Sequence, residues 1–170
     1  LSTAGTNYSY PAILHMNSIY GTDMADSFED TWTGMGNSVC TSVAYDPSST
    51  TNYNSVVQPV IDNDCDSVVM ISYAWDGAQI LEALYTQGFP GQIFGSEGVS
   101  NLNENAFAST EAAEAANGTI TIRWSEFTHS SERYDLFSEI CANYTECDAG
   151  IFMEETYDAV SIAGEAALLA

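Results

Sequence analysis

The apolar run Val68-Val69-Met70-Ile71 lies at the centre of residues 66–73 and says most about the fold of this chain. Four consecutive apolar side chains, three of them β-branched, predict a strand that is buried on both faces. Strands of this kind are typical of parallel sheets, because the crossover helices between parallel strands cover both faces of the sheet. The run therefore predicts a parallel sheet flanked by helices.

Apolar runs and amphipathic helical segments alternate along the rest of the chain. Further strands are predicted at residues 12–16, 38–45, 92–95 and 119–122. Helices are predicted at residues 22–34, where Met24, Phe28 and Trp32 are spaced by four, at 52–63, at 76–86 and in a stretch that ends near 117–118. Pro59 is expected to kink or shorten the second helix. This order predicts an α/β protein, a three-layer αβα sandwich around a mostly parallel five-stranded sheet.

The end of the chain has a different pattern. Residues 131–144 and 152–169 predict two helices with no strand between them. We therefore expect a ligand-binding lobe with the parallel sheet over residues 1–128, followed by a helical pair over residues 129–170. A chain of 170 residues is long enough to bury a core of its own.

The charge of the chain is strongly negative. It has 24 Asp and Glu residues against two arginines and no lysine, and its formal net charge at pH 7 is −22. Such a surface repels nucleic acids and anionic lipids, which argues against both as partners. It also repels itself unless salt screens it, so we expect a halophilic protein that works in salty water. A hydrophobic content of 45% argues against a disordered acidic tail.

The four cysteines allow two disulfides in any of three connectivities, although four reduced thiols remain an alternative. Cys40 lies early in the second predicted strand and Cys65 just before the third, so we pair these two, expecting neighbouring parallel strands to bring them together. Cys141 and Cys147 are close together at a helix end, and we pair them as well.

Three sequons, at Asn7, Asn117 and Asn143, predict N-glycosylation. Together with the cysteines and the acidity they favour the cell exterior. No stretch approaches the roughly 20 apolar residues that a membrane span requires, and no signal peptide is recognisable. Because the chain begins with Leu1, we expect a processed or excised piece of a longer protein.

Three side chains come after predicted strands, at the positions where parallel sheets bind ligands. Tyr20 comes after the first strand, Tyr73 after the third and Glu97 after the fourth. We expect two aromatic walls and one carboxylate at the carboxyl ends of the strands. Trp75 and Asp76 lie next to Tyr73 and are further candidates for the same cleft, although Asp76 is equally a candidate helix N-cap.

No pattern for catalysis or for a metal site is complete. Residues 62–66 have the acidic spacing of a calcium loop, but Ser67 and Tyr73 stand where the loop needs a glycine and a glutamate. We interpret this stretch as a turn between helix and strand. The nucleophile-elbow, phosphate-loop, zinc-protease and dinucleotide motifs are absent from the sequence. We therefore predict a non-enzymatic protein without metal or cofactor.

Six short strings occur in an order and at a spacing that resemble a known family, the type I periplasmic binding proteins, in the group of branched-chain amino-acid receptors of ABC importers. The resemblance covers roughly residues 11–170. The strings are Asn17-Ser18-Ile19-Tyr20-Gly21, Tyr45-Asp46-Pro47, Asp66-Ser67-Val68-Val69, Gly88-Phe89-Pro90-Gly91-Gln92-Ile93, Gly95-Ser96-Glu97-Gly98 and Tyr157-Asp158-Ala159-Val160.

The resemblance implies two α/β lobes that close over a small ligand, with this chain matching the carboxyl-terminal lobe and part of the segment after that lobe. It implies that Tyr20 and Tyr73 contact the ligand and that Glu97 holds its ammonium. It also implies an ABC permease as a partner and an amino-terminal lobe that is absent here, on which the helical pair would pack. The ligand expected is a small amino acid or a related amine.

Two other functions are compatible with the same fold. The chain is alternatively the ligand-sensing ectodomain of a signalling receptor, in which lobe closure drives signalling rather than transport. A third possibility is a structural cell-surface protein that has kept the fold and lost its ligand.

Overall fold

The computed structural model describes residues 2–3, 6–100, 102, 106–122 and 139. The chain divides into two units, Leu1–Trp124 and Ser125–Ala170, and every described residue except Glu139 belongs to the first. The predicted helical pair over 129–170 lies outside the described residues, as do Asn143 and the predicted Cys141–Cys147 pair. These three stay predictions.

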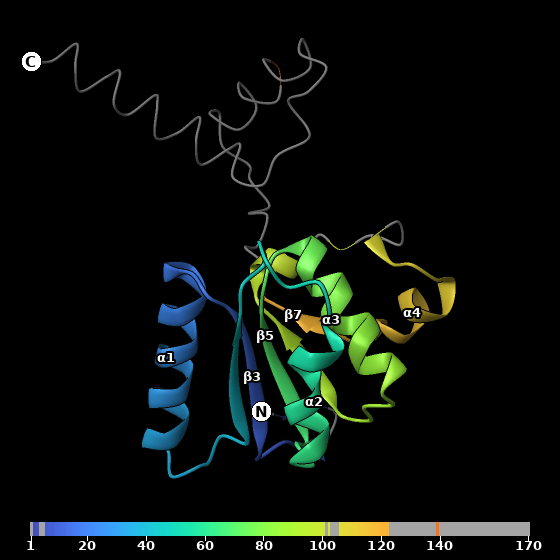
Figure 1. The fold of residues 1–170 in the computed structure, drawn as a ribbon. Helices are drawn as coiled ribbons and strands as arrows, with labels where there is room; N and C mark the ends of the chain where they lie inside the picture. The colour runs from blue at the N-terminus through green and yellow to red at the C-terminus, as the bar shows by residue number, and fades with distance from the viewer. Residues whose placement is uncertain (1, 4–5, 101, 103–105, 123–138, 140–170) are drawn as a thin grey trace, which may run out of the picture. The chain divides into compact units, whose positions relative to one another are not determined.

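Five parallel strands form the central sheet (Figure 1). They are β3 (Pro11–Met16), β4 (Thr41–Tyr45), β5 (Ser67–Ile71), β6 (Gln92–Gly95) and β7 (Ile120–Thr121). Their order in the sheet is β4-β3-β5-β6-β7, and every neighbouring pair is parallel. The apolar run Val68–Ile71 lies in the central strand β5, as its sequence predicts. Two short strands, β1 (Ser2–Thr3) and β2 (Thr6–Asn7), pair antiparallel ahead of the sheet.

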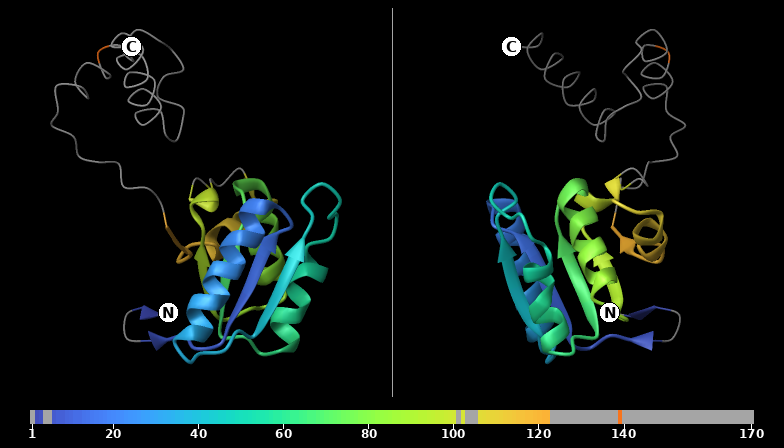
Figure 2. Two further views of the ribbon diagram at one scale, coloured as in Figure 1. Left: turned by 90° about the vertical axis from the view of Figure 1, so that its left-hand side faces the viewer. Right: turned by 45° about the vertical axis from the view of Figure 1, so that its right-hand side comes forward.

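Helices cover both faces of the sheet, which confirms the predicted three-layer α/β sandwich (Figures 1 and 2). The helix α1 (Ile19–Gly34) lies on one face. The helices α2 (Asn54–Asp62) and α3 (Ala74–Thr86) lie on the other, with α4 (Thr110–Ala115) beside α3. A short 3-10 helix, η1 (Glu97–Val99), comes after β6.

The core has two parts because neighbouring side chains on a strand point to opposite faces. The larger part lies between the sheet and α2 and α3, and the smaller part lies under α1. In the larger part, Leu14 and Met70 pack with side chains of both helices, Val57, Val60, Ile80 and Leu84. In the smaller part, Ile13 and Ile71 pack against Ala25. Each buried Leu, Ile, Val or Met side chain of this core contributes about 1.5–3 kcal/mol when it leaves water. The core therefore fixes the strand ends that carry the candidate site.

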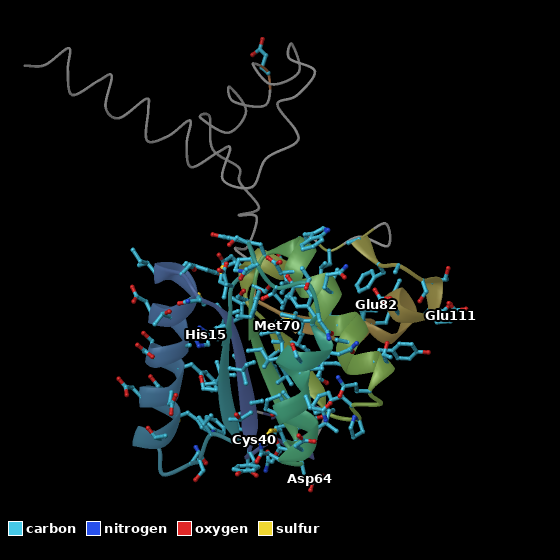
Figure 3. All side chains as sticks on the ribbon, in the orientation of Figure 1. His15, Cys40, Asp64, Met70, Glu82 and Glu111 are labelled. Atoms are coloured by element: carbon cyan, nitrogen blue, oxygen red, sulfur yellow. A yellow bond between two sulfur atoms is a disulfide. The ribbon has the colours of Figure 1, made fainter. Side chains whose placement is uncertain are left out.

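His15 is a residue of β3, and its buried side chain lies on the face of the sheet that α1 covers (Figure 3). Its Nδ1 is 3.2 Å from the carbonyl oxygen of Met16.

Two helices differ in extent from the predicted ranges. The helix α1 begins at Ile19 rather than residue 22, because the Ser18 hydroxyl caps it by accepting the N–H of Gly21 at 3.1 Å. The helix α2 keeps Pro59 inside it, but at nine residues it is shorter than the predicted 52–63. The apolar spacing located α1 correctly, yet its fully buried residues are Gly21 and Ala25, and Met24 is exposed.

The predicted disulfide between Cys40 and Cys65 is present, with Cα atoms 5.7 Å apart. It lies just before β4 and β5, at the amino-terminal end of the sheet, where Figure 3 shows Cys40. The expected reason was wrong in one respect. The strands β4 and β5 are not neighbours, because β3 lies between them. The disulfide therefore links the segments that precede the two strands on either side of β3.

Candidate ligand-binding site

The structure brings together the three side chains that the sequence places after strands. Tyr20 lies in the first turn of α1, Tyr73 immediately before α3, and Glu97 at the start of η1. The strands that precede them, β3, β5 and β6, are adjacent in the sheet. The Tyr20 hydroxyl donates a hydrogen bond to Oε2 of Glu97 at 3.1 Å. The rings of Tyr20 and Tyr73 are stacked, with centroids 5.5 Å apart and planes 6° from parallel.

Two glycines allow the close packing that this arrangement needs. A Cβ on Gly21 would collide with the carbonyl oxygen of Met16, so only glycine lets α1 begin directly against the end of β3. A Cβ on Gly98 would collide with the carbonyl oxygen of Ser72 and would lie 3.1 Å from Cδ1 of Tyr73. The absence of a Cβ at Gly21 therefore allows Tyr20 to lie at the end of β3, and its absence at Gly98 allows the segment of Glu97 to approach the loop that carries Tyr73.

A buried polar network lies next to these residues at the same end of the sheet. Tyr45 ends β4, and its hydroxyl is 2.6 Å from Oγ of Ser72, which also donates to the carbonyl oxygen of Tyr73 at 3.1 Å. Tyr53 donates to Oδ1 of Asp76 at 2.5 Å. The rings of Tyr45 and Tyr53 meet edge to face. Two buried hydrogen bonds, linked by this ring contact, thus lie beside the residue Tyr73 of the candidate site.

Three members of this network, Tyr45, Tyr53 and Ser72, were not predicted from the sequence. Tyr45 ends the second predicted strand, and Ser72 lies directly before Tyr73, so the strand-end rule that selected the other residues could have found both. Tyr53 has no such signal, because it precedes a helix and resembles an ordinary aromatic residue at its start.

The electrostatics of the site keep its phenols protonated. Burial raises the pKa of Tyr20; the hydrogen bond with Ser96 offsets part of this rise, and the Glu97 carboxylate adds to it. Burial also raises the pKa of Tyr45 to about 12, although its bond with Ser72 acts in the opposite direction. Burial and then the Asp76 carboxylate raise the pKa of Tyr53. At neutral pH these hydroxyls are therefore neutral hydrogen-bond donors.

The two remaining candidates differ in exposure. The Trp75 side chain is 63% exposed, whereas the Asp76 side chain is 6% exposed and is bound to Tyr53. The alternative prediction that Asp76 is the N-cap of its helix is wrong, because Tyr73 occupies the N-cap position and Asp76 lies within the first turn. The helix begins two residues earlier than its apolar periodicity suggests.

The site is rich in acceptors and has no strong positive charge within the described part of the chain. Both arginines, Arg123 and Arg133, lie outside the described residues, and the sequence has no lysine. Over the same described ranges, no group of three or more His, Cys, Asp or Glu side chains is placed to hold a metal ion. Of the stretch 62–66, Asp62 ends α2 and residues 63–66 form the predicted turn to β5. The arrangement suits a ligand group that donates hydrogen bonds or carries positive charge.

Two further predictions concern the outer surface. Of the sequon asparagines, Asn7 and Asn117 are exposed, and their glycosylation stays a prediction. Within the described part of the chain, no helix has the length and apolar character to cross a bilayer.

The fold is an α/β lobe with a candidate site at the carboxyl ends of its strands. A family model described as "Periplasmic binding protein" matches residues 9–170, nearly the whole chain. The chain belongs to this family of periplasmic binding proteins. Among curated protein sequences it has no match.

Solved structures with the same fold include a periplasmic binding protein type 1 from Bordetella pertussis, with a TM-score of 0.66 at 15% identity over 82% of this chain and 37% of that one. A protein from Rhodospirillum rubrum described as a branched-chain amino acid ABC transporter has a TM-score of 0.64 at 19% identity, over 91% and 43%. A solute-binding protein of an ABC transporter from R. palustris, in complex with 4-hydroxybenzoate, has a TM-score of 0.51 at 20% identity, over 55% and 26%. The chain therefore spans less than half the length of these structures.

Proposed function

We propose that this chain is one lobe of an extracellular solute-binding module of an ABC importer, and that it binds a small amino acid or a related amine. The observation that supports this most is the convergence of Glu97, Tyr20 and Tyr73 at the carboxyl ends of three adjacent strands. Membership of the periplasmic binding protein family and the R. rubrum structure support the class of function. The 4-hydroxybenzoate complex shows that ligands differ among proteins of this fold.

In this proposal the ligand ammonium binds the Glu97 carboxylate. That carboxylate already accepts one hydrogen bond from Tyr20 and has further lone pairs for ammonium protons. The stacked rings of Tyr20 and Tyr73 present apolar and π surface to the rest of the ligand, and the faces of such rings attract cations. The lobe offers only half of the contacts, and we propose that a second, amino-terminal lobe holds the ligand carboxylate. Closure of the two lobes would then present the complex to a permease.

Calorimetry on the full-length parent protein with a panel of L-amino acids tests this proposal. The variant Glu97→Gln keeps the size of the side chain and its hydrogen bond with Tyr20 but removes the charge that pairs with the ammonium. A charge-assisted hydrogen bond contributes about 1.5–3 kcal/mol, so the expected loss of affinity is roughly 10- to 100-fold.

The matched control is Glu111→Gln, which removes the same charge from an exposed position in α4. It is expected to leave affinity unchanged, so that a general effect of net charge is separated from an effect of the site. Equal binding by Glu97→Gln and the wild type would show that the ammonium is held elsewhere. Absence of binding across the panel would contradict the amino-acid ligand.

A further inference from the structure

Asp76 is a buried carboxylate whose described bonding partner is a phenol rather than a cation. Its side chain is 6% exposed, and Oδ1 accepts the Tyr53 hydroxyl at 2.5 Å. The Tyr53 side chain is itself only 7% exposed. Burying a carboxylate is unfavourable unless hydrogen bonds and local dipoles compensate. Here the compensation comes from the phenol and from the amino-terminal turn of α3, where the helix dipole favours negative charge.

This pair connects two elements on the same face of the sheet. Tyr53 is the residue before α2, and Asp76 is in the first turn of α3. The same turn is closed by the N–H of Gly77, which donates to the carbonyl oxygen of Tyr73 at 2.8 Å. The indole of Trp75 meets the ring of Tyr53 edge to face, with centroids 6.4 Å apart. One hydrogen bond therefore holds the backbone turn from which two aromatic side chains of the site project.

The first turn of α3 is not held by a capping side chain. Tyr73 is the N-cap residue of α3, and its side chain makes no capping hydrogen bond, in contrast to Ser18 at α1 and Ser109 at α4. An uncapped first turn opens more easily than the rest of a helix. The Tyr53–Asp76 bond is placed to restrain this turn.

We infer that Asp76 and Tyr53 are positioning residues, which hold Tyr73 and Trp75 in place at the site without contacting ligand themselves. The inference rests on the proposed function, because only that function makes Tyr73 and Trp75 part of a ligand-binding surface. It gives Asp76 a different role from the ligand contact expected from the sequence. A buried acid is seldom the most stabilising choice at a core position, which fits a residue kept for geometry.

The test uses hydrogen exchange by NMR on the ligand-free 170-residue chain. The variants are Tyr53→Phe, which removes the donor hydroxyl, Asp76→Ala, which removes both acceptor oxygens, and the double variant. Loss of a hydrogen bond to a charged group is expected to speed exchange of the Gly77 amide by roughly tenfold or more in each single variant. Because both changes break the same bond, the double variant should exchange no more than about twofold faster than the faster single variant.

Two further measurements separate positioning from general destabilisation. The backbone amide signals of Leu14 and Met70, in β3 and β5, should keep their wild-type chemical shifts, whereas the indole N–H signal of Trp75 should shift in both single variants. The control Tyr85→Phe removes an exposed phenol from α3 and should change neither the exchange rate of Gly77 nor the indole signal of Trp75. Unchanged Gly77 exchange in Tyr53→Phe would overturn the inference, as would an unchanged Trp75 indole signal in both single variants.

The hydrogen-exchange result does not depend on the identity of the ligand, because the chain is measured without ligand. If Glu97→Gln bound amino acids as tightly as the wild type while Gly77 exchange still responded to Tyr53→Phe, the proposed function would fail and the positioning role would stand. If Glu97→Gln lost affinity while Gly77 exchange did not respond, the positioning role would fail and the proposed function would stand.

Discussion

The same chemical change, glycine to alanine, is expected to have opposite effects at two helical positions. Gly77 lies in the first turn of α3, and a Cβ built there would be 2.6 Å from Cγ1 of Val99, which is 1% exposed. Ordinary contact begins at 3.4 Å, so α3 and η1 would have to separate by about 0.8 Å. Gly34 ends α1, and a Cβ there would meet nothing within 4 Å.

The magnitudes depend on these two environments. Alanine in place of a helical glycine stabilises by about 0.4–1 kcal/mol through the unfolded chain. Overpacking a dense core costs about 1–3 kcal/mol. Gly34→Ala should therefore raise the free energy of unfolding by up to about 1 kcal/mol. For Gly77→Ala the two effects oppose each other, and the net result should be a loss of up to about 2 kcal/mol.

Urea denaturation at constant salt, monitored by far-UV circular dichroism, measures both changes. A second background isolates the cause: in Val99→Ala the colliding methyl groups are gone, and Gly77→Ala should become stabilising, like Gly34→Ala. Because Val99 belongs to the same short helix as Glu97, Gly77→Ala should also weaken ligand binding by the parent protein. If Gly77→Ala stabilised the wild-type chain as much as Gly34→Ala, the close packing of α3 against η1 would be refuted.

Three further outcomes are expected. The disulfide closes a sequence separation of 25 residues, so replacing Cys40 and Cys65 with alanine should cost about 3.5 kcal/mol in urea denaturation, and a cost under about 1 kcal/mol would contradict the loop-entropy account. Burial raises the pKa of Tyr45 from 10.0 to about 12, so its contribution to stability is complete below pH 10 and is lost as the pH rises through 12. Alkaline unfolding curves of Tyr45→Phe should lose the part of this dependence that Tyr45 contributes and keep the part due to Tyr20 and Tyr53, and an unchanged curve would refute the assignment. Thermal melts should shift upward from dilute buffer to molar salt, because the net charge of −22 is then screened; melts independent of salt would contradict halophily.

The sheet could be predicted from the sequence because its signals are local and strong. The run Val68–Ile71 has the apolar continuity of a strand buried on both faces, and the other strands alternate with helices along the chain. The inward face of α1 was harder to predict, because its buried residues, Gly21 and Ala25, are small and carry no strong apolar signal. The order of the strands in the sheet cannot be predicted from periodicity. The disulfide pairing was therefore predicted correctly, but from the wrong assumption that β4 and β5 are neighbours.

The candidate site was predictable only where its residues come directly after strand ends. Tyr20, Tyr73 and Glu97 each come after a different strand, and parallel strands in adjacent positions bring their carboxyl ends together. The bond between Tyr53 and Asp76 had no such signal, because it depends on how two helices pack on one face of the sheet. Tyr53 and Asp76 are 23 residues apart in the chain, and a sequence pattern does not tell how closely their two helices pack.

The acidity of the chain and the selectivity of its site act over different distances. A net charge of −22 attracts any cation, whatever its shape, and in molar salt this attraction is screened within about 3 Å. The Tyr20–Glu97 hydrogen bond, at 3.1 Å and partly buried, is a direct contact and survives that screening. Under the proposed function, discrimination among amines in salty water therefore comes from short-range geometry, that is, from one carboxylate bonded to a phenol and from two stacked rings. A lobe that depended on its overall charge for binding would lose its ligand in the salty water that we expect for this chain.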